Sequence, residues 1–72
     1  MNLTPVESSN IAGVHYDPST GTLTVQFHSG ARYAYYDVSP KLVAELMEAK
    51  SKGSYFSSAI KPYHPVKKLG GS

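Results

Sequence analysis

The chain has 72 residues, enough for one small domain, and folding of so short a chain buries only about 60% of the surface that the unfolded chain exposes. Hydrophobic residues make up 40% and charged residues 17%, which favours a thin two-layer core over disorder. The absence of cysteine excludes disulfides, cysteine-type zinc sites and thiol catalysis. No apolar run approaches the roughly 18 residues of a membrane helix, so we expect a cytoplasmic protein. We do not expect an enzyme, because so short a chain has difficulty enclosing a water-excluded pocket.

The charges are unevenly distributed along the chain. Residues 1–48 hold two cationic and five acidic side chains, whereas residues 49–72 hold five lysines and no acid. The first part therefore carries a net charge of −3 and the last part +5, for a total of +2. This asymmetry favours an anionic partner for the C-terminal third, either nucleic acid or an acidic protein surface. The alternative is that lysines simply collect at helix ends and in solvated tails, and the sequence does not separate the two interpretations.

The first half of the chain predicts strands joined by turns. Residues 1–9 are polar, contain Pro5 and are expected to be extended. β-branched and aromatic residues predict a first strand over Ile11–Tyr16, and strict alternation predicts a second over Thr22–Phe27. The intervening Asp-Pro-Ser-Thr-Gly is typical of a turn. A third strand is expected over Ala31–Tyr36.

Two registers compete in the second hairpin. A two-residue loop would force a positive φ on Ser29, which serine tolerates poorly. A three-residue loop over residues 28–30 instead places Gly30 at the left-handed position. It also sorts apolar from polar pairs, matching Val25 with Tyr33, Leu23 with Tyr35, Gln26 with Arg32, and Thr24 with Ala34. We therefore predict the three-residue loop.

The second half predicts helices. A main helix is expected to begin after Ser39, a suitable N-cap, and to end at Gly53. A second, short helix is expected over residues 55–60, before Pro62. These elements indicate an α+β fold, a small three-stranded antiparallel meander with the main helix and the short C-terminal helix packed on one face. The expected organisation is an extended segment over 1–9, a single domain over 10–63 and a flexible basic tail over 64–72.

No catalytic or metal-binding pattern is present. The histidines at positions 15, 28 and 64 are not at helical ligand spacing, and the last two are expected to be exposed polar residues. Glu45 and Glu48 lie three residues apart on the predicted helix, where a solvated face is the simpler interpretation. We therefore expect no catalytic residues, no cofactor and no metal site.

Tyrosines and cations form the candidate binding surface. Aromatic rings interleaved with cations stack on bases and contact phosphates in sheet-based RNA-binding proteins. The register assigns Tyr33 and Tyr35 to the core and leaves the outer face to their polar neighbours, although such residues suit a protein interface equally well. The C-terminal lysines beside an aromatic residue indicate either a segment that docks on a partner or a solubilising tail. The candidate partner-binding residues are Arg32, Tyr36, Lys61, Tyr63, Lys67 and Lys68.

Read as a whole, the chain resembles the KTSC domain family, named for its occurrence at the C terminus of some lysyl-tRNA synthetases. The combination is specific and spans residues 6 to 63, its main pieces being Ser8-Ser9-x-Ile11, Leu23 to Phe27, Tyr33-x-Tyr35 and Ala49-x-Ser51-x-Gly53-x-x-Phe56. There is no synthetase body, so the resemblance implies a stand-alone member. It implies a non-enzymatic module, with RNA binding as the function proposed for the family.

Two functional hypotheses follow. Stand-alone domains of this kind also occur in bacteria and their phages, and the chain is similar in size to a bacteriophage transcription regulator. The leading hypothesis is therefore a phage-type regulator that binds bacterial RNA polymerase and inhibits or redirects it. The alternative is an RNA-binding module like the C-terminal domain of some lysyl-tRNA synthetases. Under both hypotheses we expect a monomer that does not bind membranes.

Overall fold

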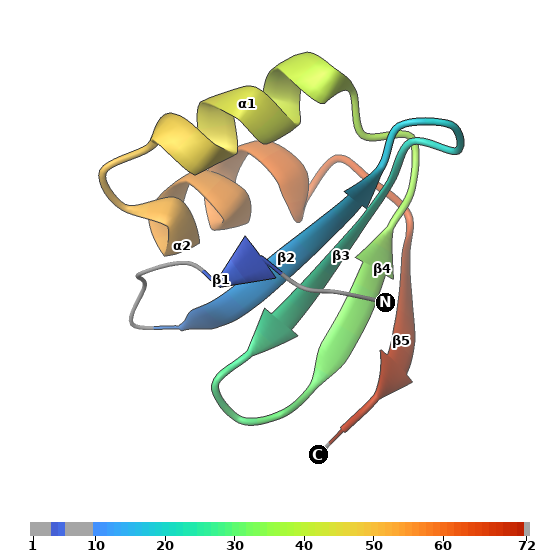
Figure 1. Ribbon diagram of the computed structural model, residues 1–72, viewed down its shortest axis with the longest axis vertical. Coiled ribbons are helices and arrows are strands. Elements are labelled where there is room, and N and C mark those ends of the chain that lie inside the picture. The colour runs from blue at the N-terminus through green and yellow to red at the C-terminus, as the bar shows by residue number, and fades with distance from the viewer. Residues whose placement is uncertain (1–3, 6–9, 72) are drawn as a thin grey trace.

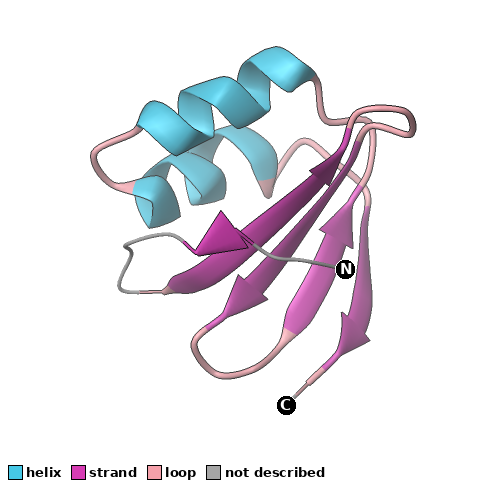
Figure 2. Ribbon diagram, viewed as in Figure 1, coloured by secondary structure: helices cyan, strands magenta, loops and turns pink. Residues whose placement is uncertain are grey.

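The computed structural model describes residues 4–5 and 10–71, and its elements form a sheet covered on one face by helices (Figures 1 and 2). The strands lie side by side in chain order, and every neighbouring pair is antiparallel. None of the helices in the described part of the chain is long and apolar enough to cross a membrane.

The predicted meander is present. Strands β2 (Ile11–Asp17), β3 (Thr22–Phe27) and β4 (Arg32–Tyr35) follow one another, and the first turn closes where Gly21 N donates to Asp17 O at 2.9 Å. The predicted three-residue loop is confirmed, because Gln26 pairs with Arg32 and the loop ends in Gly30 with a φ of 96°. Apolar alternation and a glycine able to adopt positive φ are sufficient to define this register.

The helices lie where the pattern predicts, but the boundary between them is different. Helix α1 (Pro40–Glu48) begins after Ser39, whose Oγ accepts a hydrogen bond from Leu42 N at 3.2 Å. It ends at Glu48 because the next residue is extended, and Gly53 lies inside helix α2 (Lys52–Tyr55) instead of ending α1. Gly53 is buried.

The last turns before Pro62 form a π-helix, η1 (Phe56–Ile60), instead of a continuous α-helix. It follows α2 directly, so the predicted short helix over residues 55–60 exists, but it has the wider π form from Phe56 to Ile60. Phe56 and Ile60 are its buried residues, and they hold it against the sheet.

The sheet has more strands than the three predicted. Strand β5 (Val66–Gly70) pairs with β4, and the two-residue strand β1 (Thr4–Pro5) pairs with β2 at the opposite edge. The rest of the predicted extended segment 1–9 lies outside the described residues. The prediction of three strands is wrong because segments before and after the meander pair with its two outer strands.

Residues 66–70 correct the prediction of a flexible tail over 64–72. The described part of that segment completes the sheet, whereas the domain boundaries themselves stay a prediction. A close approach of two backbone segments anchors its end, since a Cβ on Gly71 would overlap the carbonyl oxygen of Gly30. The residue types alone gave no signal because β5 is exposed along most of its length.

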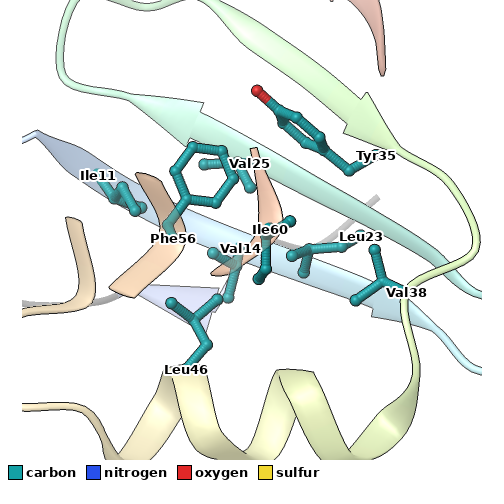
Figure 3. Packing of buried hydrophobic residues seen from close by; sticks show 9 residues of the cluster. All are labelled: Ile11, Val14, Leu23, Val25, Tyr35, Val38, Leu46, Phe56 and Ile60. Atoms are coloured by element: carbon teal, nitrogen blue, oxygen red, sulfur yellow. The ribbon is translucent and has the colours of Figure 1, made fainter. Parts of the chain in front are cut away.

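The core lies between the sheet and the helices. Figure 3 shows side chains from α1 and η1 meeting those of the strands. The buried cluster consists of Ile11, Val14, Leu23, Val25, Tyr35, Val38, Leu46, Phe56 and Ile60. The face of the sheet that contacts the helices is therefore the one that carries Val25 and Tyr35, and the pleat places their sequence neighbours on the opposite, outer face.

Candidate nucleic-acid interface

The pairing of β5 with β4 brings three of the predicted site residues to one edge of the sheet. Arg32 stands opposite Gly70, while Lys67 pairs with Ala34 and Lys68 with Tyr33. All three cationic side chains are exposed. Sequence reasoning named these residues but placed the lysines in a separate tail, so their convergence with Arg32 comes from the strand that it missed.

The pleat of the sheet divides these cations between its two faces. Because side chains of directly paired residues share a face, Lys68 lies on the helix side with Tyr33, and Lys67 lies on the outer face with Ala34. Arg32 and Tyr36 are each two residues from Ala34 and share its face. We call Arg32, Tyr36 and Lys67 the outer patch.

Backbone contacts fix Tyr36 within the outer patch. Its N–H donates to Pro65 O at 3.0 Å, and its carbonyl oxygen lies 3.1 Å from Nδ1 of His64. Tyr36 is half-buried, so part of its ring is accessible. His64 is half-buried too, which corrects the prediction of an exposed histidine in the tail. The outer patch therefore combines a partly exposed ring with two cations.

The remaining two predicted residues lie apart from the outer patch. Tyr63 is 75% exposed, in the turn that follows η1, where its N–H donates to Ile60 O at 3.1 Å. Lys61 begins this turn, and its N–H donates to Phe56 O at 2.9 Å. Lys61 faces a cavity on the helix side of the sheet that sequence reasoning did not predict.

This cavity has a volume of about 620 Å³ and lies between η1, the β3–β4 hairpin and the start of β5. Phe27, Tyr33, Tyr35 and Phe56 contribute aromatic rings to its wall. These rings pack edge to face, with centroids of Phe27 and Tyr33 5.8 Å apart and those of Tyr35 and Phe56 4.9 Å apart. Burial, and then the neighbouring Tyr33, raise the pKa of the Tyr35 hydroxyl above its ordinary value, so Tyr35 remains neutral at physiological pH. The sequence signal for the cavity was the family motif, since its residues Tyr33, Tyr35, Gly53 and Phe56 all line the cavity.

The electrostatics of this region are cationic. Neither β4 nor β5 carries an acidic residue, and the described cavity wall has none either. Within the described ranges, no group of three or more His, Cys, Asp or Glu residues is arranged to hold a metal ion. The chemistry available is therefore contact with anions and with flat rings.

Two kinds of protein are similar in sequence to this chain. An uncharacterized protein of Stutzerimonas stutzeri (strain A1501) is 41% identical over 64 residues, which are 89% of this chain and 90% of that protein. A lysine–tRNA ligase of Nostoc sp. (strain PCC 7120) is 46% identical over 55 residues, which are 76% of this chain but only 10% of the ligase. The chain thus matches nearly the whole of one small protein and a short part of a long one.

A solved structure has the same fold. The crystal structure of a KTSC domain protein from Yersinia pestis matches with a TM-score of 0.91 and 35% sequence identity, covering 96% of this chain and 97% of that one. The sequence model of the KTSC domain matches residues 7–64. The resemblance inferred from the motifs is confirmed, and the chain belongs to the KTSC domain family.

Proposed function

We propose that this domain is a non-enzymatic module that binds single-stranded RNA through the edge formed by β4 and β5. The observation that carries the proposal is the β4–β5 pairing, which collects Arg32, Lys67 and Lys68 on two acid-free strands. Cations so arranged contact successive phosphates, and the Tyr36 ring within the outer patch offers a surface on which a base stacks.

The relatives support a nucleic-acid partner. Several of them are named lysine–tRNA ligase, and the matched segment is a small part of those proteins. An appended module that holds RNA fits an enzyme named for tRNA. Bacterial RNA polymerase, the partner favoured from the sequence, has no comparable support among the names of the relatives reported above.

Fluorescence anisotropy with a labelled single-stranded RNA oligonucleotide, measured over a range of salt concentrations, tests the proposal. The triple variant with Arg32→Ala, Lys67→Ala and Lys68→Ala should bind weakly and flatten the plot of log affinity against log salt, by about 0.7 for each lost phosphate contact. The matched control removes two exposed lysines on and just after α1, Lys41→Ala and Lys50→Ala, and should keep most of the slope. A triple variant with wild-type affinity and slope would contradict the proposal.

One observation favours the second candidate, a protein partner such as RNA polymerase. Strand β5 lies at the edge of the described sheet and carries two exposed apolar residues, Val66 at 51% and Leu69 at 46%. An edge strand of this kind accepts an extended segment of another protein by strand addition. A pull-down from bacterial lysate separates the candidates. Polymerase subunits retained after nuclease and high salt would support the protein partner, and RNA lost on nuclease treatment would support RNA binding.

A further inference from the structure

The cavity beside η1 has the size and wall of a ligand site. Its volume of about 620 Å³ lies within the range of roughly 300–1,000 Å³ typical of small-molecule sites. Four aromatic residues contribute to it, of which Phe27 and Tyr33 are only half-buried and so expose part of their rings. Ser57 on η1 and Lys61 after it stand on the solvent side of the wall, since both are exposed.

The π-helix brings Lys61 to the same side as Phe56. The N–H of Lys61 donates a hydrogen bond to the carbonyl oxygen of Phe56, five residues earlier, and a bond of this span is the mark of a π-helical turn. In a regular α-helix, residues five apart point about 140° away from each other around the axis. Here Phe56, Ser57 and Lys61 all line the same cavity. Widened turns are frequent at functional sites, which is a second reason, independent of volume, to look for a ligand here.

The charges and polar groups indicate the kind of ligand. Lys61 is the one lysine or arginine on the described wall, and no acid opposes it there. Lys68 adds a second cation on the same face of the sheet, two residues from Val66, which also lines the cavity. An anionic group therefore fits the rim, and a flat ring fits the aromatic interior. The hydroxyl groups of Ser57 and Tyr33 can both donate and accept hydrogen bonds, which the edge of a base requires.

We propose that this cavity binds one unpaired nucleobase of an RNA strand, with the 5′-phosphate of the same nucleotide at Lys61. The inference rests on the proposed RNA binding and adds to it the step that recognises a base. The backbone follows the edge formed by β4 and β5, where Lys68 lies on the cavity's side of the sheet and the outer patch on the other. The cavity accepts a base that has left the stack, as in other proteins that read single-stranded RNA. The domain therefore distinguishes single-stranded from fully paired RNA, because a paired base does not enter the cavity.

Substitutions at two adjacent serines test the inference. Ser57 lines the cavity, whereas Ser58, which is also exposed on η1, does not. Ser57→Phe should obstruct the cavity with an added ring, and Ser58→Phe is the matched control for that ring. Isotope-labelled protein is titrated with adenosine 5′-monophosphate, adenosine and inorganic phosphate while amide chemical shifts are followed. Wild type and Ser58→Phe should show saturable shifts at Gly53, Ser57 and Lys61 with the nucleotide, and Ser57→Phe should bind at least about fivefold more weakly.

A second variant keeps the test valid if Ser57→Phe does not fold. Lys61→Gln changes an exposed residue and should weaken binding of adenosine 5′-monophosphate but not of adenosine. Equal cavity shifts with inorganic phosphate alone would overturn the inference in favour of a simple anion site. Nucleotide shifts that are absent, or confined to the outer patch, would also overturn it.

RNA binding of the same variants distinguishes this inference from the proposed function. If Ser57→Phe binds single-stranded RNA as wild type does, the cavity inference is wrong and RNA binding at the outer patch stands. If the nucleotide enters the cavity but the protein binds no RNA oligonucleotide, the proposed function is wrong and the cavity is a mononucleotide site. Loss of affinity for single-stranded RNA in Ser57→Phe but not in Ser58→Phe supports both.

Discussion

The hydroxyl of Tyr16 donates a hydrogen bond of 2.6 Å to the backbone carbonyl of Val38. The backbone of Val38 makes a second bond to the same hairpin, because Val38 N donates to Gly21 O at 2.9 Å. Val38 is 2% exposed and lies between β4 and α1. These two bonds attach the β2–β3 turn to the start of the helical layer, so the tyrosine links the two layers by a polar contact at the edge of the core.

Removal of this hydroxyl should reduce stability without changing the fold. Tyr16→Phe keeps the ring and deletes the donor, so the free energy of unfolding should fall by about 1 kcal/mol, and by more if the carbonyl of Val38 is left unsatisfied. Urea denaturation gives this value directly. Tyr63→Phe is the control, since Tyr63 is 75% exposed and its loss of a hydroxyl should change the free energy of unfolding very little. Equal stability of Tyr16→Phe and wild type would show that the bond contributes nothing.

The meander was predictable because its signals are local. Thr22–Phe27 alternates, and Gly30 stands where the loop requires a positive φ, so sorting of apolar pairs leaves one register. Ser39 and Pro40 likewise define the start of α1 within a few residues of sequence. Each of these features depends on neighbours in the chain.

Strand β5 and the cavity depend on contacts between distant segments, which is why neither was predicted. Both faces of β5 are largely exposed, so it has no alternation to detect, and it forms because the edge of β4 accepts it. The residues of the candidate site were therefore predicted, but their arrangement was not. Its cations were named from the sequence, but the edge that gathers Arg32 and Lys67, and the π-turn that directs Lys61 to the cavity, were not.

The docking of β5 should be sensitive to one glycine and not to its neighbour. Gly71 has a φ of 88° and a Cβ there would overlap Gly30 O, whereas a Cβ on Gly70 meets nothing within 4 Å. Gly71→Ala should therefore loosen the end of β5. The positive φ alone should lower the stability of the docked strand by about 1–2 kcal/mol. Hydrogen exchange of β5 amides measures this loosening. Gly70→Ala should retain protection, and equal protection in both variants would mean that Gly71 does not anchor the strand.

Acid should weaken the first turn through Asp17. The hydroxyl and the N–H of Ser19 donate hydrogen bonds to the carboxylate of Asp17 at 2.6 and 3.0 Å. These bonds lower the pKa of Asp17 from its ordinary value of 3.8. Because the folded state favours the ionised form, the contribution to stability is present above 3.8 and is lost as the pH falls through the lower, folded pKa. Denaturation at several pH values should show this loss in wild type. In Asp17→Asn the free energy of unfolding should decrease less over that pH window. If its dependence on pH is the same as in wild type, Asp17 is not the source of the loss.

The contact between the two helices should appear in an alkaline titration. Tyr55 donates a hydrogen bond of 2.6 Å to Oε2 of Glu45, and this bond, followed by desolvation and the negative charge of Glu45, raises the pKa of Tyr55 above 10.0. The folded state therefore favours the protonated hydroxyl, and the link between α1 and α2 is present below pH 10 and is lost as the pH rises through the raised pKa. Glu45→Gln should bring the pKa of Tyr55 back toward 10.0, as followed by the chemical shift of its ring Cζ.

The matched control for this titration is Glu48→Gln, an exposed carboxylate on the same helix three residues further along. It removes the same charge from α1 without removing the acceptor of Tyr55, so the pKa of Tyr55 should stay raised. If both variants lower that pKa equally, the general negative charge of the helix is responsible and the hydrogen bond is not. If only Glu45→Gln lowers it, the bond itself fixes the position of α2 against α1, and with it the start of the π-turn that carries Lys61.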